Sequence, residues 1–179
     1  MKHCHRTAFA LLLAVAACGA DAPPPPAAGA ATPETTRFVV AADPGEALAV
    51  TAAKAKGPAR TAVVQGRIAA VVKGFAVFTL MDKALPYCGE TDAEDDCKTP
   101  WDYCCEPAKT RTEHAMVVEL RGADGKPLAT PSLPDLRLLD DVKVQGELTK
   151  DADGNFVLLA RGVFRVNRPK LPESLKWPQ

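Results

Sequence analysis

Two segments that lie far apart in the sequence share one pattern, a glycine inside a run of branched residues. Segment 63–68 reads VVQGRI, and segment 143–148 reads KVQGEL. Valine and isoleucine favour strands, whereas an internal strand glycine often marks a bulge or a sharp bend. Such bends are what curl a sheet into a closed barrel. Gly66 and Gly146 therefore predict a strongly curled sheet.

Five segments have the composition of strands and are separated by turn-forming residues. They are 61–72, 75–81, 114–121, 142–149 and 156–166. Five curled strands favour a mainly β protein, a small five-stranded barrel of the OB type. A β-sandwich is the alternative, although it needs about seven strands. We expect the barrel domain to span 37–168, with a C-terminal tail at 169–179.

Shorter elements flank these strands. Segment 37–40 is a candidate short strand, and the alanine-rich segment 46–56 is a candidate helix that Gly57-Pro58 ends. Segment 133–141 is expected to form a loop or a helical turn. In the second strand, Phe75 and Phe78 differ in parity, so at most one of them can face outward.

The first 17 residues are typical of an export signal. Lys2 and Arg6 give a basic start, and the uncharged run that follows is too short to span a membrane. Small residues then precede Cys18, as in the bacterial lipobox, where the leader is cleaved before a cysteine that becomes lipidated. The alternative is an ordinary cleavage site with Cys18 incidental.

Residues 18–36 follow as a Pro/Ala-rich stretch with four consecutive prolines, which predicts an extended tether. Gly19 occupies the position after the cysteine, where by analogy with lipoprotein sorting an aspartate would retain the chain at the inner membrane. We therefore expect a lipid-anchored protein of the bacterial cell envelope, on the outer membrane and facing the periplasm. No later stretch is apolar enough to span a bilayer.

Charge argues against a nucleic-acid partner. The chain has 22 basic and 22 acidic residues, and loss of the leader leaves 20 against 22. A net-acidic domain lacks the attraction to phosphate that dominates nucleic-acid affinity. Binding of single-stranded nucleic acid by an OB barrel is thus a less favoured hypothesis.

A long insert, 83–113, separates the second and third strands and holds every cysteine of the mature domain: Cys88, Cys97, Cys104 and Cys105. An oxidising compartment favours disulfides between them. Bonding of adjacent cysteines requires a strained ring. Two pairings remain open, Cys88–Cys104 with Cys97–Cys105 and Cys88–Cys105 with Cys97–Cys104.

The same cysteines have two other interpretations, a metal site and free redox-active thiols. Four thiolates suit zinc, but zinc sites usually use two close C-x2–4-C pairs, and only C-C is close here. His114 and Met116, expected on one face of the third strand, would extend the set toward copper. Our prediction is disulfides and no cofactor, with zinc or copper as the alternative.

Segment 99–107 (TPWDYCCEP) is the most distinctive in the chain. Together with the lipobox, the tether and the two glycine-containing strands, it resembles a group of uncharacterised bacterial lipoproteins with an OB-like core. The resemblance covers nearly the whole mature chain. It implies a fold and a location, and it implies no catalytic residue.

A non-enzymatic binding or structural module is the function that these observations favour. OB barrels bind ligands on the face of the second and third strands and the loops around it, beside which the insert should lie. Candidate ligand-binding residues, for an unknown ligand or envelope protein, are Tyr87, Trp101, Asp102, Tyr103 and Glu106. The aromatic residues among them have an alternative role, packing on the disulfides.

Enzyme chemistry has little support. A Ser-His-Asp site would have to combine His114 with Ser132 or Ser174, and the sequence around these residues does not resemble a nucleophile elbow. A phosphate-binding glycine loop, an H-E-x-x-H motif and a C-x-x-C motif are also missing from the sequence.

Overall fold

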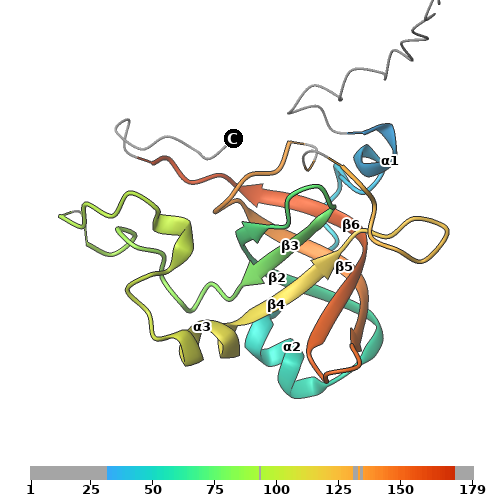
Figure 1. Ribbon diagram of the computed structural model, residues 1–179, viewed down its shortest axis with the longest axis horizontal. Coiled ribbons are helices and arrows are strands. Elements are labelled where there is room, and N and C mark those ends of the chain that lie inside the picture. Colours follow the sequence, from blue (N-terminus) through green and yellow to red (C-terminus); the bar gives the residue numbers. More distant parts are fainter. Residues whose placement is uncertain (1–31, 93, 131–132, 134, 172–179) are drawn as a thin grey trace, which may run out of the picture.

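The computed structural model describes residues 32–92, 94–130, 133 and 135–171 (Figure 1). The predicted leader (1–17), the predicted lipidation site Cys18 and most of the tether (18–36) lie outside the described residues, as does most of the tail. Within the described part of the chain, no helix is long and apolar enough to cross a membrane.

Five strands close into a barrel, as the sequence predicts. They pair in the order β2-β3-β4-β6-β5, and β5 returns to pair with β2. All contacts between neighbours are antiparallel except β4 with β6, which is parallel. The strands are β2 (Ala59–Val71), β3 (Val77–Met81), β4 (Ala115–Glu119), β5 (Asp141–Lys150) and β6 (Phe156–Asn167). A closed five-stranded barrel confirms the OB-like prediction and excludes the β-sandwich.

The two glycine-containing segments pair with each other and close this barrel. Val64 lies opposite Val144, and Gly66 lies opposite Val142. A Cβ atom on Gly66 would lie 2.5 Å from the carbonyl oxygen of Met81, so β2 and β3 approach too closely there for any side chain. Gly146 lies at a register shift between β5 and β6, which is the bulge expected of a strand glycine.

The barrel interior is filled by branched and aromatic side chains. Phe78 is 1% exposed and lies in this core, whereas Phe75 is 47% exposed, so the parity prediction is confirmed. The buried members contributed by β2, β5 and β6 are Val64, Ile68, Val142, Val144, Leu148, Leu158, Ala160 and Val163. Alternating buried residues along each strand give one continuous core.

Two segments differ from the prediction at the N-terminal side. Residues 37–40 do not form a strand. They follow the short helix α1 (Pro33–Thr36), and Val39 makes an isolated bridge to Val163. The helix predicted over 46–56 begins later, as α2 (Val50–Lys56), because Leu48–Ala49 instead pairs parallel to β2 as the short strand β1. Gly57, at φ 85°, ends α2 as predicted.

Asp82, the residue after β3, caps α2 from a distance. The N-cap position of α2 is Ala49, which has no side-chain acceptor. The Asp82 carboxylate instead accepts hydrogen bonds from the Thr51 backbone N–H at 2.8 Å and from the Thr51 hydroxyl at 2.7 Å. The first turn of a helix has free N–H groups, so this contact fixes α2 against the start of the insert.

An ion pair between Arg168 and the buried Asp140 follows the last strand. Asp140 is fully buried, and both of its carboxylate oxygens accept from Arg168, at 2.7 and 2.8 Å. The Arg137 backbone N–H also donates to this carboxylate, at 2.9 Å. The contact ties the residue after β6 to the turn before β5.

Candidate functional site

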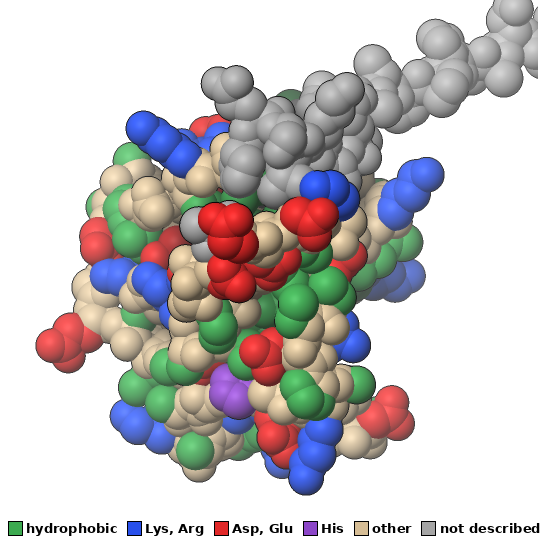
Figure 2. Space-filling model, turned by 90° about the vertical axis from the view of Figure 1, so that its left-hand side faces the viewer, with side chains coloured by type: hydrophobic (Ala, Val, Ile, Leu, Met, Phe, Trp, Pro, Cys, Tyr) green, Lys and Arg blue, Asp and Glu red, His purple; other side chains and the backbone are tan. Residues whose placement is uncertain are grey.

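The insert lies between β3 and β4, as predicted, and forms the lobe at the left of Figure 1. It contains two regular elements, the 3-10 helix η1 (Pro100–Asp102) and the helix α3 (Ala108–His114). It also carries eight acidic residues against four basic ones. Figure 2 shows acidic side chains gathered on this side of the molecule, which disfavours an anionic ligand on its surface.

The predicted aromatic residues anchor the insert to the outside of the barrel. Trp101 and Tyr103 are buried in a second hydrophobic cluster with Leu85, Leu139, Ala69 and Met81. Ala69 and Met81 come from β2 and β3, so the cluster joins the insert to these strands. Burial of these two large aromatic side chains helps to hold the insert against the barrel.

Tyr103 has an unusual environment. Its backbone lies in the left-handed region, at φ 50°, and the residue is 1% exposed. Among the described residues its hydroxyl oxygen is the one buried side-chain polar atom without a hydrogen-bond partner. Burial raises the pKa of Tyr103 to about 12, so the phenol is neutral.

Tyr87 lies nearer the surface. The Arg67 guanidinium stacks on its ring at 5.2 Å and also contacts the Glu90 carboxylate. Burial is the main cause that raises the pKa of Tyr87, and the Glu90 charge adds to it. The residue packs against the second cluster, so its ring helps to cover the insert.

The four cysteine sulfur atoms gather at one place in the insert. The Sγ atom of Cys88 lies 3.5 Å from that of Cys105 and 3.7 Å from that of Cys104. The Sγ atom of Cys97 lies 3.6 Å from that of Cys104. These separations are longer than a disulfide bond. Among the described cysteines no pair therefore lies at bonding distance; Cys88 is buried, and Cys104 and Cys105 are exposed.

The thiols differ in acidity. Burial alone would raise the pKa of Cys88, but hydrogen bonds from the Cys105 backbone N–H and from neighbouring thiols outweigh it and lower this pKa. Hydrogen bonds with Cys97 and Cys88 raise the pKa of Cys104 to about 12. The Cys105 pKa is raised as well, first by its hydrogen bond with Cys88. Cys88 is therefore favoured over Cys104 and Cys105 as the thiolate.

The wider copper set is not brought together. The expected strand 114–121 begins one residue later, and His114 instead ends α3, where its Nδ1 lies 2.9 Å from the Thr110 carbonyl oxygen. Met116 is buried in the barrel core. The placement of both on one strand face is therefore wrong. In the described chain, the metal-competent group is Cys88, Cys104 and Cys105, whose sulfur atoms lie within 4.8 Å of one another.

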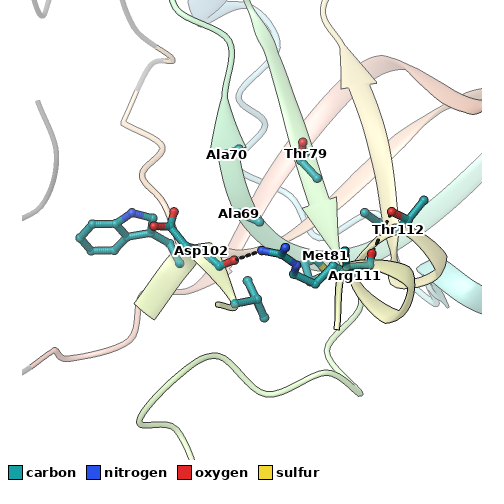
Figure 3. Close-up of a pocket in the computed structure, with 11 residues that line it drawn as sticks. Ala69, Ala70, Thr79, Met81, Asp102, Arg111 and Thr112 are labelled. Carbon is teal, nitrogen blue, oxygen red and sulfur yellow. Dashed lines mark hydrogen bonds between the residues drawn. The ribbon is translucent and has the colours of Figure 1, made fainter. Parts of the chain in front are cut away.

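A shallow hollow of about 350 Å³ lies where β2 and β3 meet the insert (Figure 3). Its strand side is lined by small or apolar residues, and its other side comes from η1 and α3. Three predicted ligand-binding residues, Trp101, Asp102 and Tyr103, line it. Tyr87 and Glu106 are not among the lining residues. The remaining lining residues are Ala69, Ala70, Thr79, Met81, Ala108, Arg111, Thr112 and Ala115.

Arg111 lines the hollow but was not among the predicted ligand-binding residues. It reaches from α3 toward η1, and its Nη1 donates to the Asp102 carbonyl oxygen at 3.1 Å (Figure 3). The sequence does indicate the start of α3, because Pro107 precedes a run of helix-compatible residues and proline is favoured near helix starts. The α3 helix places both Arg111 and Thr112 at the hollow.

No family model and no curated protein matches this chain. The geometry of the insert and of the hollow therefore carries the functional argument.

Proposed function

We propose that the protein is an exported lipoprotein, anchored through Cys18, whose OB-like barrel is a non-enzymatic binding module. Its ligand binds in the hollow between β2, β3 and the insert. The location rests on the leader, the lipobox-like segment and the Pro-rich tether. The single observation that carries the binding role is the hollow itself. Its lining includes Thr79 and Met81 of β3, the second barrel strand, and Ala115 of β4, the third, and OB barrels use the face of these two strands for ligands.

The lining indicates the chemistry of the ligand. Ala69, Ala70 and Met81 give an apolar floor, and small alanines leave room above the strands. Asp102 and Arg111 bring one acidic and one basic side chain to the opposite wall. A shallow site of this kind suits one apolar group with a polar end, as on a peptide side chain of an envelope protein, better than a large cofactor.

A second candidate, metal binding or thiol redox chemistry, is supported by the close sulfur atoms of Cys88, Cys104 and Cys105. Soft thiolates select zinc or copper(I). This function and ligand binding in the hollow involve different residues of one insert, so they can be tested separately.

The anchor predicts fatty-acid labelling that depends on Cys18. Cells that express the full chain are fed an alkyne fatty acid, and the purified protein is then assayed for the label. We expect incorporation into the wild type and its loss in Cys18→Ala, because that thiol carries the lipid. Cys4→Ala is the matched control and should keep the label, since Cys4 lies inside the leader. Labelling that survives Cys18→Ala contradicts the anchor.

The hollow predicts weak binding of small apolar probes. The full lipoprotein in phosphatidylcholine nanodiscs is titrated with phenethyl alcohol, 3-phenylpropionate and phenethylamine, followed by saturation-transfer NMR with empty nanodiscs as the blank. We expect millimolar binding of at least one probe and a loss of tenfold or more in Ala70→Trp, because the exposed Ala70 lines the hollow and tryptophan fills it.

Ala152→Trp, in the exposed β5–β6 turn, is the control and should bind as the wild type does. Equal binding by Ala70→Trp and the wild type, or no binding of any probe, contradicts the site. The order of the three probe affinities reports whether Asp102 or Arg111 contacts the polar end of the probe.

A further inference from the structure

We infer that the four insert cysteines form two nested disulfides, Cys88–Cys105 and Cys97–Cys104, and that these bonds hold the insert wall of the hollow in place. The inference rests on the proposed function in two respects, export to an oxidising compartment and the hollow as the binding site. It selects one of the two pairings that the sequence leaves open.

The sulfur contacts distinguish these pairings. In space the sulfur atoms run in the order Cys105, Cys88, Cys104 and Cys97, with successive separations of 3.5, 3.7 and 3.6 Å. Joining Cys88 to Cys105 and Cys97 to Cys104 uses a direct contact for both bonds. The other pairing uses the central contact and must then join the two ends of the row. Small side-chain movements thus suffice for the first pairing.

The same geometry disfavours a tetrahedral zinc site. With zinc–sulfur bonds of about 2.3 Å, all six sulfur–sulfur separations would be about 3.8 Å. Cys97 does not belong to the group whose sulfur atoms lie mutually within 4.8 Å, so at least one of its separations is longer. Cys104 and Cys105 are also exposed, whereas structural zinc ligands are usually enclosed.

The nested bonds would act on the hollow through η1. The inner bond closes loop 97–104, which contains Trp101 and Asp102, both lining residues. The outer bond ties Cys88, next to Tyr87, to the residue that follows this loop. Closing short loops removes conformational freedom from the open form of the insert. Reduction should therefore loosen the wall of the hollow while the barrel stays folded.

Formation of each bond is a thiol–disulfide exchange with a disulfide of an oxidising envelope protein. One thiol of each pair, Cys88 in the outer pair, attacks that disulfide as its thiolate and releases one sulfur of the oxidising protein as a thiol. The other cysteine of the pair, Cys105 in the outer pair, then loses its proton, attacks the mixed disulfide and releases the second sulfur of the oxidising protein as a thiol. Each bond thus costs the insert two protons and two electrons, which the oxidising protein accepts. The Cys105 backbone N–H bonded to Cys88 sulfur stabilises the attacking thiolate.

The test maps the pairing in the full chain exported in bacterial cells. Protein is trapped with N-ethylmaleimide, and free thiols and bound metal are counted by intact mass. The wild type should show no alkylated thiol among the four cysteines and no metal. Cys88→Ser/Cys105→Ser should remain free of alkylation, because it keeps the Cys97–Cys104 pair. The matched variant Cys88→Ser/Cys104→Ser should gain two alkylated thiols.

The reverse pattern in the two variants overturns the pairing, as do free thiols or a bound metal ion in the wild type. Mass-spectrometric fragmentation of the wild-type insert peptide between Cys104 and Cys105 assigns the bonds directly. This assignment decides the result if the two remaining cysteines form a disulfide in both variants. These readouts need no ligand, so they can fail while the hollow still binds its probes. The second half of the inference predicts that reduction weakens probe binding by tenfold or more, and unchanged binding overturns it.

Discussion

Replacing Gly146 with alanine is expected to destabilise the protein by about 3 kcal/mol. A Cβ atom at this position would lie 2.2 Å from the Leu159 carbonyl oxygen and 3.1 Å from the Ala160 Cα atom. Both belong to the backbone of β6, so no side-chain rotation relieves the contact. The two strands must separate, and their separation disrupts the β5–β6 pairing at the bulge. Since domains of this size are stable by about 5–15 kcal/mol, the loss is large.

Thermal and denaturant unfolding of the full chain, followed by circular dichroism, measure this effect. Gly162→Ala is the matched control, because Gly162 also lies in a buried strand but its Cβ would meet only the Val40 side chain, at 3.1 Å. We expect that control to lose less than about 1 kcal/mol. Equal losses in the two variants would show that the close approach of β5 and β6 does not set the barrel.

The prediction of the barrel from the sequence succeeded because its strongest signal was local. Gly66 and Gly146 interrupt strands of branched residues, and a strand glycine has few roles other than a bend or a close approach. The structure places both at such approaches. The strand pattern also determined which face is buried, as Phe75 and Phe78 show, since the side-chain period of a strand is two residues.

The predicted bounds of helices and strands were wrong where tertiary contacts override local conformational preference. Residues 46–49 have helix-compatible composition, yet Leu48–Ala49 pairs with β2 because an exposed strand edge is available there. His114 lies in sequence beside a strand, but α3 continues through it. Element boundaries depend on such contacts, which no short window of sequence contains.

The candidate site was only half predictable. Trp101, Asp102 and Tyr103 could be proposed because they lie in the insert that joins the two strands of the OB ligand-binding face. Ala70 on β2 and Arg111 on α3 also line the hollow, but no motif singles them out as ligand-binding residues. They join the hollow only because the insert folds back over the barrel, which is a property of the whole chain.

Removal of the Asp82 carboxylate is expected to cost about 3 kcal/mol in Asp82→Ala. This side chain is 1% exposed and accepts from the Thr51 N–H, the Thr51 hydroxyl and the Ala84 N–H. Alanine leaves these three donors without their charged acceptor and α2 without its cap. Asp82→Asn keeps one acceptor oxygen, so we expect a smaller loss, about 1–2 kcal/mol. Urea unfolding at neutral pH ranks the two variants.

The same carboxylate makes stability depend on pH in a defined direction. Burial would raise the pKa of Asp82, but the hydrogen bonds from Thr51 and Ala84, with the charge of His114, outweigh it and lower this pKa below the ordinary value of 3.8. A group whose pKa is lower in the folded state stabilises the fold above its unfolded pKa and loses that contribution as the pH falls through the folded value. The free-energy difference between wild type and Asp82→Asn should therefore be full above about pH 5 and shrink as the pH falls below the ordinary value of 3.8. Unfolding curves of both proteins across this range measure it, and a difference that stays constant or grows as the pH falls would mean that Asp82 acts through packing alone.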